Sequence, residues 1–371
     1  MDSASSSTWL EIDLEAIRHN VRELRRISGR PLMAVVKANG YGHGLVEAGR
    51  AALQGGAAWL GVARIEEALP LRAAGITAPI LVLGYLSPLW VREALANRIT
   101  VAAYDPELAK SLAAAARACG GELQVHAKFD TGMGRLGVFP EDGVDFIRQL
   151  RDLAGLQLTG MFTHFARADE LERATTELQN QRFQALVSRL EQAGLRPPLV
   201  HAANSAGTLF FPEARYDLTR CGISIYGLDP SDETPLPASF RKALVWKARL
   251  SSVKFLPANH GVGYAHRYYT QAVERIGAAA VGYADGLRRR LGNFALVGGK
   301  RVRLVGGVCM DQIMLQLDEV PEARIGDEVV LIGRQGEQEI TAEEIGRAWG
   351  TVNYDVVCGL EARVPRFYIN E

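Results

Sequence analysis

Several features that mark other protein classes are scarce in this chain of 371 residues. Lys plus Arg and Asp plus Glu both number 42, so the formal net charge is zero and we expect neither nucleic acid nor a membrane as a partner. No apolar run approaches the roughly 20 residues that a transmembrane helix needs. Residues 1–8 lack the basic and apolar regions of a signal peptide, so we expect no secretory leader.

The cysteines and histidines also lack the spacing of a metal site. The four cysteines lie far apart with no CxxC pair, which is typical of reduced thiols in a cytoplasmic protein rather than of a disulfide framework or a zinc site. His126, His201 and His260 do not have metal-ligand spacing either. We therefore expect a cytoplasmic location and no metal.

Short apolar runs alternate with amphipathic or Ala-rich stretches over the first part of the chain. The apolar runs lie at 32–38, 59–63, 79–84, 100–104, 123–130, 158–165, 199–204 and 216–222. Such alternation is typical of successive βα units on a parallel sheet, and eight units over roughly 200 residues predict a (β/α)8 TIM barrel. No GxGxxG follows the first run, which disfavours a dinucleotide-binding domain.

The pattern changes after residues 229–240, a stretch rich in Pro, Asp and Ser that is typical of a linker. Most of the β-type runs that follow have no helix between them, which predicts a second, mainly antiparallel β domain. One helix is predicted at 341–350, with Thr341 as N-cap and Glu344 completing a capping box. We expect domains at 9–232 and 233–371, with the first residues as candidates to pair with the β domain.

The most informative segment is PLMAVVKANGYGHG, residues 31–44. An apolar run ends in Lys37, and the chain then turns through three glycines together with Tyr41 and His43. A lysine at the C-terminal end of a buried strand is placed to form a Schiff base, because partial desolvation lowers its pKa and frees the amine. The alternative is an ordinary surface lysine that follows a strand.

Other polar residues follow the predicted strands at the end where barrels carry their active sites. These residues are Lys128, Arg135, His164, Asn204, Ser205, Arg220, Gly222 and Ile223. The loops after the seventh and eighth strands commonly bind phosphate; Ser205 opens a helix there and Gly222 allows close backbone approach. A Schiff-base lysine facing a phosphate cradle describes a site for pyridoxal 5'-phosphate (PLP).

A set of motifs in a fixed order carries a family resemblance. The motifs are AVVKANGYGHG, KFDTGMGRLG, THFA, HAANS, RCGISIYG, GVGYAHRY, VGYADG, VCMDQ and TVNYDVVCGLEARVPR. From about residue 8 to the C-terminus the chain resembles alanine racemase of the bacterial type. The resemblance implies a PLP barrel followed by a β domain. It also implies interconversion of L-alanine and D-alanine, which supplies D-alanine for cell-wall peptidoglycan.

The resemblance implies two catalytic groups. Lys37 would hold PLP through a Schiff base and exchange the proton on the D side, while Tyr264, from the other subunit of a homodimer, would serve the L side. Two groups on opposite faces allow the α-proton to leave one face and return to the other. One departure is Ala265, where family members often carry glycine; it leaves Tyr264 in place but could tilt it.

The remaining roles implied by the resemblance concern cofactor and substrate. The cofactor contacts would be Tyr41, Arg135, His164, Asn204, Ser205, Arg220, Gly222, Ile223 and Tyr354. Arg135, the backbone at Met310 and Asp311, and Tyr283 would contact the substrate. Arg220 would face the pyridine nitrogen of PLP and keep it unprotonated, because a guanidinium only donates. Lys128 is either carbamylated, as in many family members, or an unmodified lysine in an ion pair.

Three alternatives stay open at this point. A racemase of another amino acid, such as serine, would share the site, although its membrane-anchored and periplasmic forms would carry segments that are missing here. A PLP-dependent decarboxylase of similar architecture would carry a glycine-rich phosphate loop and a catalytic cysteine motif, which we do not find. A PLP-binding homeostasis protein would be a barrel alone, without Tyr264 or residues 233–371.

Overall fold

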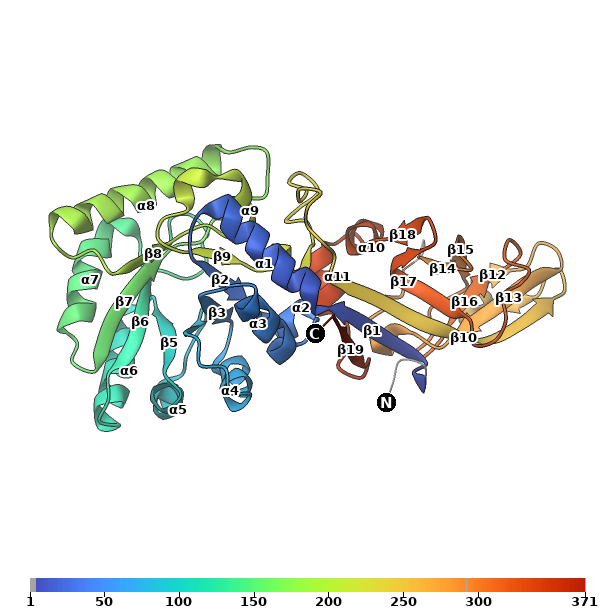
Figure 1. The fold of residues 1–371 in the computed structure, drawn as a ribbon, viewed down its shortest axis with the longest axis horizontal. Helices are drawn as coiled ribbons and strands as arrows, with labels where there is room; N and C mark the ends of the chain where they lie inside the picture. Colours follow the sequence, from blue (N-terminus) through green and yellow to red (C-terminus); the bar gives the residue numbers. More distant parts are fainter. Residues whose placement is uncertain (1–4, 291–292, 371) are drawn as a thin grey trace. The chain divides into compact units, whose positions relative to one another are not determined.

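The computed structural model describes residues 5–290 and 293–370, and the chain forms two compact units (Figure 1). One unit spans Ala16–Arg241 and is called the barrel unit below. The other, called the β unit, combines the amino-terminal stretch up to Glu15 with the chain from Lys242 onward. In the described part of the chain, no helix is both long enough and apolar enough to cross a membrane.

The barrel unit is built on eight parallel strands. They are β2 (Leu32–Val35), β3 (Trp59–Val62), β4 (Ile80–Val82), β5 (Ile99–Ala103), β6 (Leu123–Lys128), β7 (Leu156–Phe162), β8 (Leu199–His201) and β9 (Thr219–Cys221). Each strand from β2 to β7 pairs with the next one in the chain, and β9 returns to pair with β2. Between β8 and β9, the Asp217 N–H donates to the Val200 carbonyl (3.0 Å) and the Arg220 N–H donates to the Ala203 carbonyl (2.9 Å). These two bonds close the ring.

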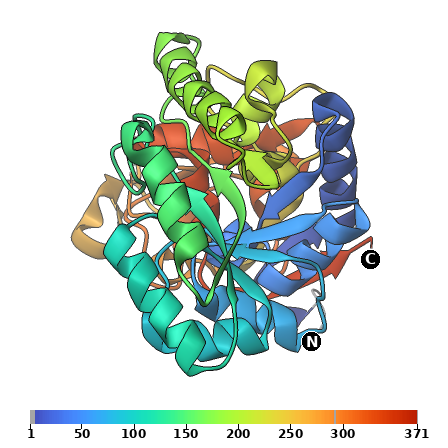
Figure 2. The same ribbon diagram turned by 90° about the vertical axis from the view of Figure 1, so that its left-hand side faces the viewer.

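Helices surround these strands, as Figure 2 shows from the end of the barrel unit. They are α1 (Leu14–Ser28), α2 (Lys37–Tyr41), α3 (Leu45–Gln54), α4 (Ile65–Ala73), α5 (Val91–Ala96), α6 (Pro106–Ala118), α7 (Gly143–Asp152), α8 (Ala174–Gln192) and α9 (Ser205–Phe210). Helix α6 illustrates the local signals: the Asp105 side chain accepts a hydrogen bond from the Leu108 N–H (2.8 Å), and Pro106 occupies the first turn. Such a cap stabilises a helix by about 1 kcal/mol.

All eight predicted strands are present, so the predicted parallel barrel is confirmed. The strands are shorter than the apolar runs at several ends. The first run was predicted as a strand over 32–38, but β2 ends at Val35 because Val36 (φ −113°, ψ 18°) already leaves the extended region and the backbone at Ala38–Tyr41 is left-handed. A left-handed backbone cannot continue a β ladder.

The β unit is mainly antiparallel, as predicted. Its strands are β1 (Thr8–Asp13), β10 (Leu244–Leu256), β11 (Gly261–Val262), β12 (Tyr268–Tyr269), β13 (Glu274–Ala279), β14 (Phe294–Val297), β15 (Lys300–Val305), β16 (Ile313–Gln316), β17 (Glu328–Gln335), β18 (Gln338–Ile340) and β19 (Arg366–Ile369). The pairings β10–β13–β16–β15–β14–β17 return to β10, so six strands form a closed circuit. Strand β1 pairs antiparallel with β10 and parallel with β19.

The helices of the β unit differ in part from the prediction. Helix α10 (Ala342–Trp349) begins as predicted, with the Thr341 hydroxyl accepting from the Glu344 N–H (3.1 Å). The predicted capping box is wrong in its second half, because the Glu344 carboxylate pairs with Arg301 instead. A second helix, α11 (Asn353–Cys358), was not predicted.

Short 3-10 turns complete both units. They are η2 (Pro88–Trp90), η3 (Pro140–Asp142), η4 (Pro212–Ala214), η5 (Ile223–Tyr226), η6 (Tyr264–His266) and η7 (Tyr283–Asp285). Three of them contain residues that the sequence nominates for the site: Ile223, Tyr264 and Tyr283.

Candidate active site

Lys37 opens a turn of unusual handedness directly after β2. Ala38, Asn39, Gly40 and Tyr41 have φ angles of 52°, 54°, 62° and 51°, all in the left-handed region. This conformation costs a residue with a side chain roughly 1–2 kcal/mol, and it rarely extends beyond single residues. The surrounding structure must therefore hold the turn in place.

Two hydrogen bonds that involve side chains connect this turn to its surroundings. The Glu67 Oε1 accepts from the Ala38 N–H at 2.6 Å, and the Asn39 Oδ1 accepts from the Leu45 N–H at 3.0 Å. A hydrogen bond to a charged group contributes about 1.5–3 kcal/mol, which is comparable to the cost of one or two left-handed residues. The turn is stable because its neighbours offset its conformational cost.

Tyr41, at the end of the turn, lies against the loop that follows β9. A Cβ added to Gly222 would lie only 2.4 Å from the Tyr41 hydroxyl oxygen, so glycine alone allows this approach. The Ser205 Oγ accepts from the Gly222 N–H at 3.1 Å. Asn204 caps the same helix, α9, by accepting from the Gly207 N–H at 2.9 Å. The turn after β2 and the loops after β8 and β9 therefore meet at Gly222.

This meeting point has the donors that a phosphate group needs. Two hydroxyl groups, of Tyr41 and Ser205, lie beside the backbone of Gly222, and Ile223 follows in the chain. The Ser224 Oγ nearby is buried and has no hydrogen-bond partner in the described part of the chain. A buried hydroxyl without a partner is costly. The donor set fits the phosphate of PLP.

Arg220, the middle residue of β9, lies at the centre of a buried network. Its NH1 donates to the His201 Nδ1 (3.0 Å) and its NH2 to the His164 Nδ1 (3.2 Å). NH2 also donates to the Thr163 and Ala202 carbonyls, both at 2.8 Å. The guanidinium has no acceptor, so both imidazoles must accept on Nδ1 and carry their proton on Nε2.

The protonation states in this network follow from burial and charge. Burial lowers the pKa of Arg220 to about 9, so the guanidinium stays charged at neutral pH. Burial, together with the Arg220 charge, holds the pKa of His164 and of His201 well below the ordinary value. Arg220 is therefore a permanent donor, and the two imidazoles are neutral.

The histidine network reaches further than the sequence indicated. The His201 Nε2 lies 2.9 Å from the His126 Nδ1, inside the barrel. Burial, followed by the Arg220 charge, lowers the pKa of His126 to about 3. The sequence prediction excluded these two histidines as metal ligands but did not find this role. Their positions on β6 and β8 were the signal, because barrel strands point alternate side chains inward.

Arg135 lies in a loop that a single carboxylate holds. The Asp130 Oδ1 accepts from the N–H groups of Gly132 (2.9 Å), Met133 (2.8 Å) and Gly134 (3.1 Å), and its Oδ2 accepts from that of Arg135 (3.0 Å). Burial opposes ionisation of Asp130, but these four donors outweigh it and hold its pKa below the ordinary value. The motif around Arg135 did not single out Asp130 as a functional residue.

Lys128, at the end of β6, is buried and close to two arginines. Its Nζ lies 5.7 Å from the centre of the Phe162 ring. Burial, followed by the charges of Arg135 and Arg220, lowers the pKa of Lys128 to about 8. Roughly a tenth of such an amine is neutral at pH 7. This neutral fraction is the form that reacts with CO2.

Tyr264 belongs to the β unit and is 74% exposed. It opens η6, between Gly263 at φ 69° and Ala265 at φ 58°. A glycine at position 265 would adopt this φ without strain, whereas alanine adopts it at a cost. The departure noted in the sequence therefore places a strained residue directly after Tyr264.

The β unit also brings two nominated segments together. The Tyr283 N–H donates to the Cys309 carbonyl and the Ala284 N–H to the Met310 carbonyl, both at 3.0 Å. Asp311, next in the chain, pairs with Arg363 at 2.7 Å. Met310, Asp311 and Tyr283 thus form one local group. Tyr354 lies on α11 in the same unit.

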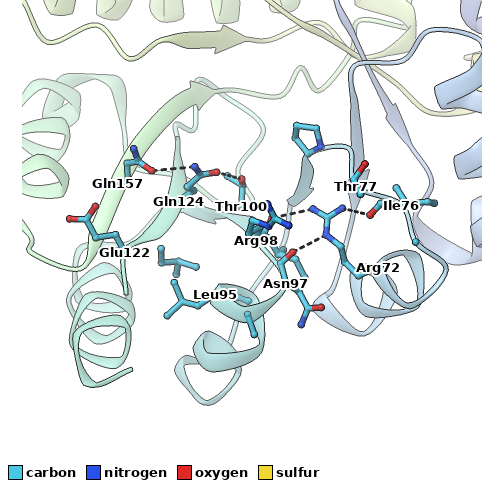
Figure 3. Close-up of a pocket in the computed structure, with 16 residues that line it drawn as sticks. Arg72, Ile76, Thr77, Leu95, Asn97, Arg98, Thr100, Glu122, Gln124 and Gln157 are labelled. Carbon is cyan, nitrogen blue, oxygen red and sulfur yellow. Dashed lines mark hydrogen bonds between the residues drawn. The ribbon is translucent and has the colours of Figure 1, made fainter. Parts of the chain in front are cut away.

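A cavity lies away from these residues, at the amino-terminal ends of the barrel strands (Figure 3). It measures about 520 Å³ and is lined by Arg72, Arg98, Gln124 and Gln157 among others. The Arg72 guanidinium donates to the carbonyls of Ile76, Ala78, Asn97 and Arg98, so it joins loops. Active sites of TIM barrels lie at the opposite face, which is where Lys37 and Arg220 are found.

Comparison with known families accounts for nearly the whole chain. Residues 12–230 match the model of the alanine racemase N-terminal domain, and residues 243–368 match that of the C-terminal domain. An alanine racemase of Symbiobacterium thermophilum is 48% identical over 367 residues, covering 98% of this chain and 97% of the relative. One of Desulfovibrio desulfuricans is 43% identical over 373 residues and covers both chains fully.

Comparison with solved structures points to the same family as these relatives. Alanine racemase from Streptomyces lavendulae superposes with a TM-score of 0.94 at 40% identity, covering 99% of this chain and 98% of the other. The enzyme from Bacillus anthracis with bound L-Ala-P has a TM-score of 0.92 at 39% identity, covering 98% and 95%. The predicted fold class, activity and cofactor are confirmed. The chain belongs to the alanine racemase family, PLP-dependent isomerases that interconvert L-alanine and D-alanine.

Proposed function

We propose that Lys37 and Tyr264 are the two acid/base groups of this alanine racemase and that two copies of the chain share each active site. The proposal rests on one observation: Lys37, the Tyr41–Ser205–Gly222 cradle and the buried Arg220 lie together at one end of the barrel. No other place in the described part of the barrel unit combines a lysine at a strand end with such a donor set.

PLP, when bound, withdraws electrons from the substrate and makes its α-proton easier to remove. Tyr41, Ser205, the backbone of Gly222 and Ile223, and Tyr354 would hold its phosphate. Asn204 and His164 complete the proposed cofactor contacts. Arg220 would donate toward the pyridine nitrogen and, being charged at neutral pH, would have no means of accepting a proton from it.

Proton transfer needs one group on each face of the substrate carbon. In the D-to-L direction the Lys37 amine takes the α-proton from one face and the Tyr264 hydroxyl gives a proton to the other; the roles reverse from L to D. Arg135 and the backbone of Met310 and Asp311 bind and orient the substrate carboxylate, and Tyr283 lines the substrate entry. Carbamylated Lys128 would pair with the Arg135 side chain and fix its orientation.

The homodimer is supported by the exposure of Tyr264. A large aromatic side chain that is 74% exposed in one chain is a candidate for burial against another. We also propose folding domains at 9–232 and 233–371, with the first residues paired with the β domain through β1, together with a cytoplasmic location and D-alanine supply to peptidoglycan as the biological role.

Racemisation of L-alanine, compared with L-serine, by the purified protein and two variants tests the assignment. Lys37→Ala and Tyr264→Phe should each lose nearly all activity. Mixing the two variants under subunit exchange should restore up to about a quarter of wild-type activity, because half of the dimers are mixed and each holds one intact site. Mixtures that stay inactive although mass spectrometry shows mixed dimers would contradict the shared site.

A further inference from the structure

Glu67 is a partly buried carboxylate of the barrel unit that the proposed chemistry does not use. It lies in the first turn of α4, and its Oε2 accepts from the N–H groups of Ala63 (2.8 Å) and Arg64 (3.3 Å). Its other oxygen, Oε1, accepts from the N–H of Ala38 at 2.6 Å. One carboxylate therefore joins the start of α4 to the turn that follows β2.

The bond to Ala38 bears directly on Lys37. The Ala38 N–H belongs to the peptide group that follows Lys37, and Ala38 is the first residue of the left-handed stretch. The Gly40 N–H bonds back to the Val36 carbonyl (2.8 Å) and Asn39 bonds Leu45 (3.0 Å), so these contacts hold the later part of the turn. Glu67 therefore holds the N–H of the peptide group that directly follows the lysine.

We propose that Glu67 is a positioning residue that fixes the orientation of Lys37 for proton transfer. The inference rests on the role proposed for Lys37 above. The peptide plane between residues 37 and 38 sets the direction in which the lysine side chain leaves the backbone. A displacement of about 1 Å at a catalytic group can cost on the order of a hundredfold in rate.

The chemistry of the bridge requires a carboxylate. The Glu67 carboxylate accepts on both oxygens, and the donors at its two ends are backbone N–H groups. A glutamine side chain has one accepting oxygen and one donating NH2 group, so at one end of the bridge its NH2 group would face a backbone N–H and could not accept from it. An aspartate keeps the charge and can cap α4, but it is one methylene too short to reach Ala38 as well.

A purely structural role in capping α4 is the competing explanation, and the variants separate the two. Glu67→Gln and Glu67→Asp are compared with Glu66→Gln, which removes the same charge from the exposed neighbouring residue. Three measurements are made on the holoenzyme: hydrogen exchange of peptide 36–44, borohydride trapping of PLP on Lys37 by mass spectrometry, and kcat with KM for L-alanine.

We expect faster exchange in 36–44, slower trapping, and a kcat about tenfold or more lower in both Glu67 variants, with KM within about threefold of wild type. Glu66→Gln should match wild type. If Glu67→Asp keeps the hydrogen-exchange protection of α4 but shows the same losses in trapping and kcat, those losses come from the positioning of Lys37 and not from the capping of α4. Glu67 variants that equal Glu66→Gln in trapping and kcat would overturn the inference. Wild-type enzyme that traps no PLP on Lys37 would instead overturn the proposed function.

Discussion

The Lys37 turn and the Arg135 loop lie in the same barrel unit, and each is held by a carboxylate, but the carboxylates come from different places. Asp130 precedes Arg135 by five residues and accepts four N–H groups of its own loop. Glu67 lies 29 residues after Ala38 and accepts across two βα units. One loop organises itself, and the other depends on its neighbour.

The difference lies in when each conformation can form. Closing a loop of five residues costs little entropy, so the Asp130 loop needs only its own segment. The left-handed backbone at Ala38–Tyr41 is unfavourable alone and requires β3, α4 and the Gly222 loop to be in place. The lysine of this site is therefore oriented only in the folded barrel.

Replacing Asp130 should have the largest effect on stability and on substrate binding. In Asp130→Ala four backbone N–H groups lose their charged acceptor, and we expect about 3 kcal/mol lower stability and a KM for alanine raised tenfold or more. Urea unfolding and steady-state kinetics measure these quantities. Asp152→Ala, at the exposed end of α7, is the control. If exchange of peptide 130–138 stays at the wild-type rate, the Arg135 loop does not depend on Asp130.

Replacing Gly222 tests the contact between Tyr41 and Gly222 at the other end of the Lys37 turn. In Gly222→Ala the new Cβ would meet the Tyr41 hydroxyl, so the cradle must open and PLP affinity should fall about tenfold. Fluorescence titration of the apoenzyme with PLP measures the Kd. Gly307→Ala is the matched control, because its nearest neighbouring atom would be 3.9 Å away. Unchanged affinity in Gly222→Ala would show that Tyr41 can move without loss.

Replacing Lys128 should have the smallest effect, a change in how stability depends on pH. Burial first, and then Arg135 and Arg220, lower its pKa to about 8, so the folded protein disfavours the charged amine. The unfolded chain binds more protons between the folded and unfolded pKa values, so stability should rise with pH there. In CO2-free buffer, the free energy of unfolding of the wild-type protein should rise from pH 7 to pH 9 by about 1 kcal/mol more than that of Lys128→Met.

Carbamylation of Lys128 is tested in the same samples. With bicarbonate present, intact-mass spectrometry should show one added CO2, and the pH dependence just described should disappear because the carbamate is an anion. A stability difference that is flat with pH in CO2-free buffer would contradict the lowered pKa. A mass that does not change with bicarbonate would favour the unmodified lysine.

Local patterns accounted for much of the fold. Alternating apolar runs and helices located all eight barrel strands, and Thr341 was placed correctly as a cap because a cap depends on residues three positions away. The capping box at Glu344 was wrong because a distant residue, Arg301, competes for the same carboxylate. Local rules fail where a long-range partner offers a stronger bond.

The candidate site shows the same division. Ordered motifs nominated Lys37, Arg220 and Tyr264, but they did not identify Glu67, His126 or His201. The partners of these three are 29, 75 and 19 residues away, in the bonds Glu67–Ala38, His126–His201 and His201–Arg220. No spacing rule links residues that a barrel brings together only after its strands have closed.

The sequence by itself determined the alternation of strands and helices, the chemistry available at the strand ends, and the family. These depend on hydrophobic periodicity and residue type, which act over a few positions. Tertiary structure decided the handedness of the Lys37 turn, the contact of Tyr41 with Gly222, and the tautomers around Arg220. Each depends on bonds between distant βα units, whose donors and acceptors meet only in the closed barrel.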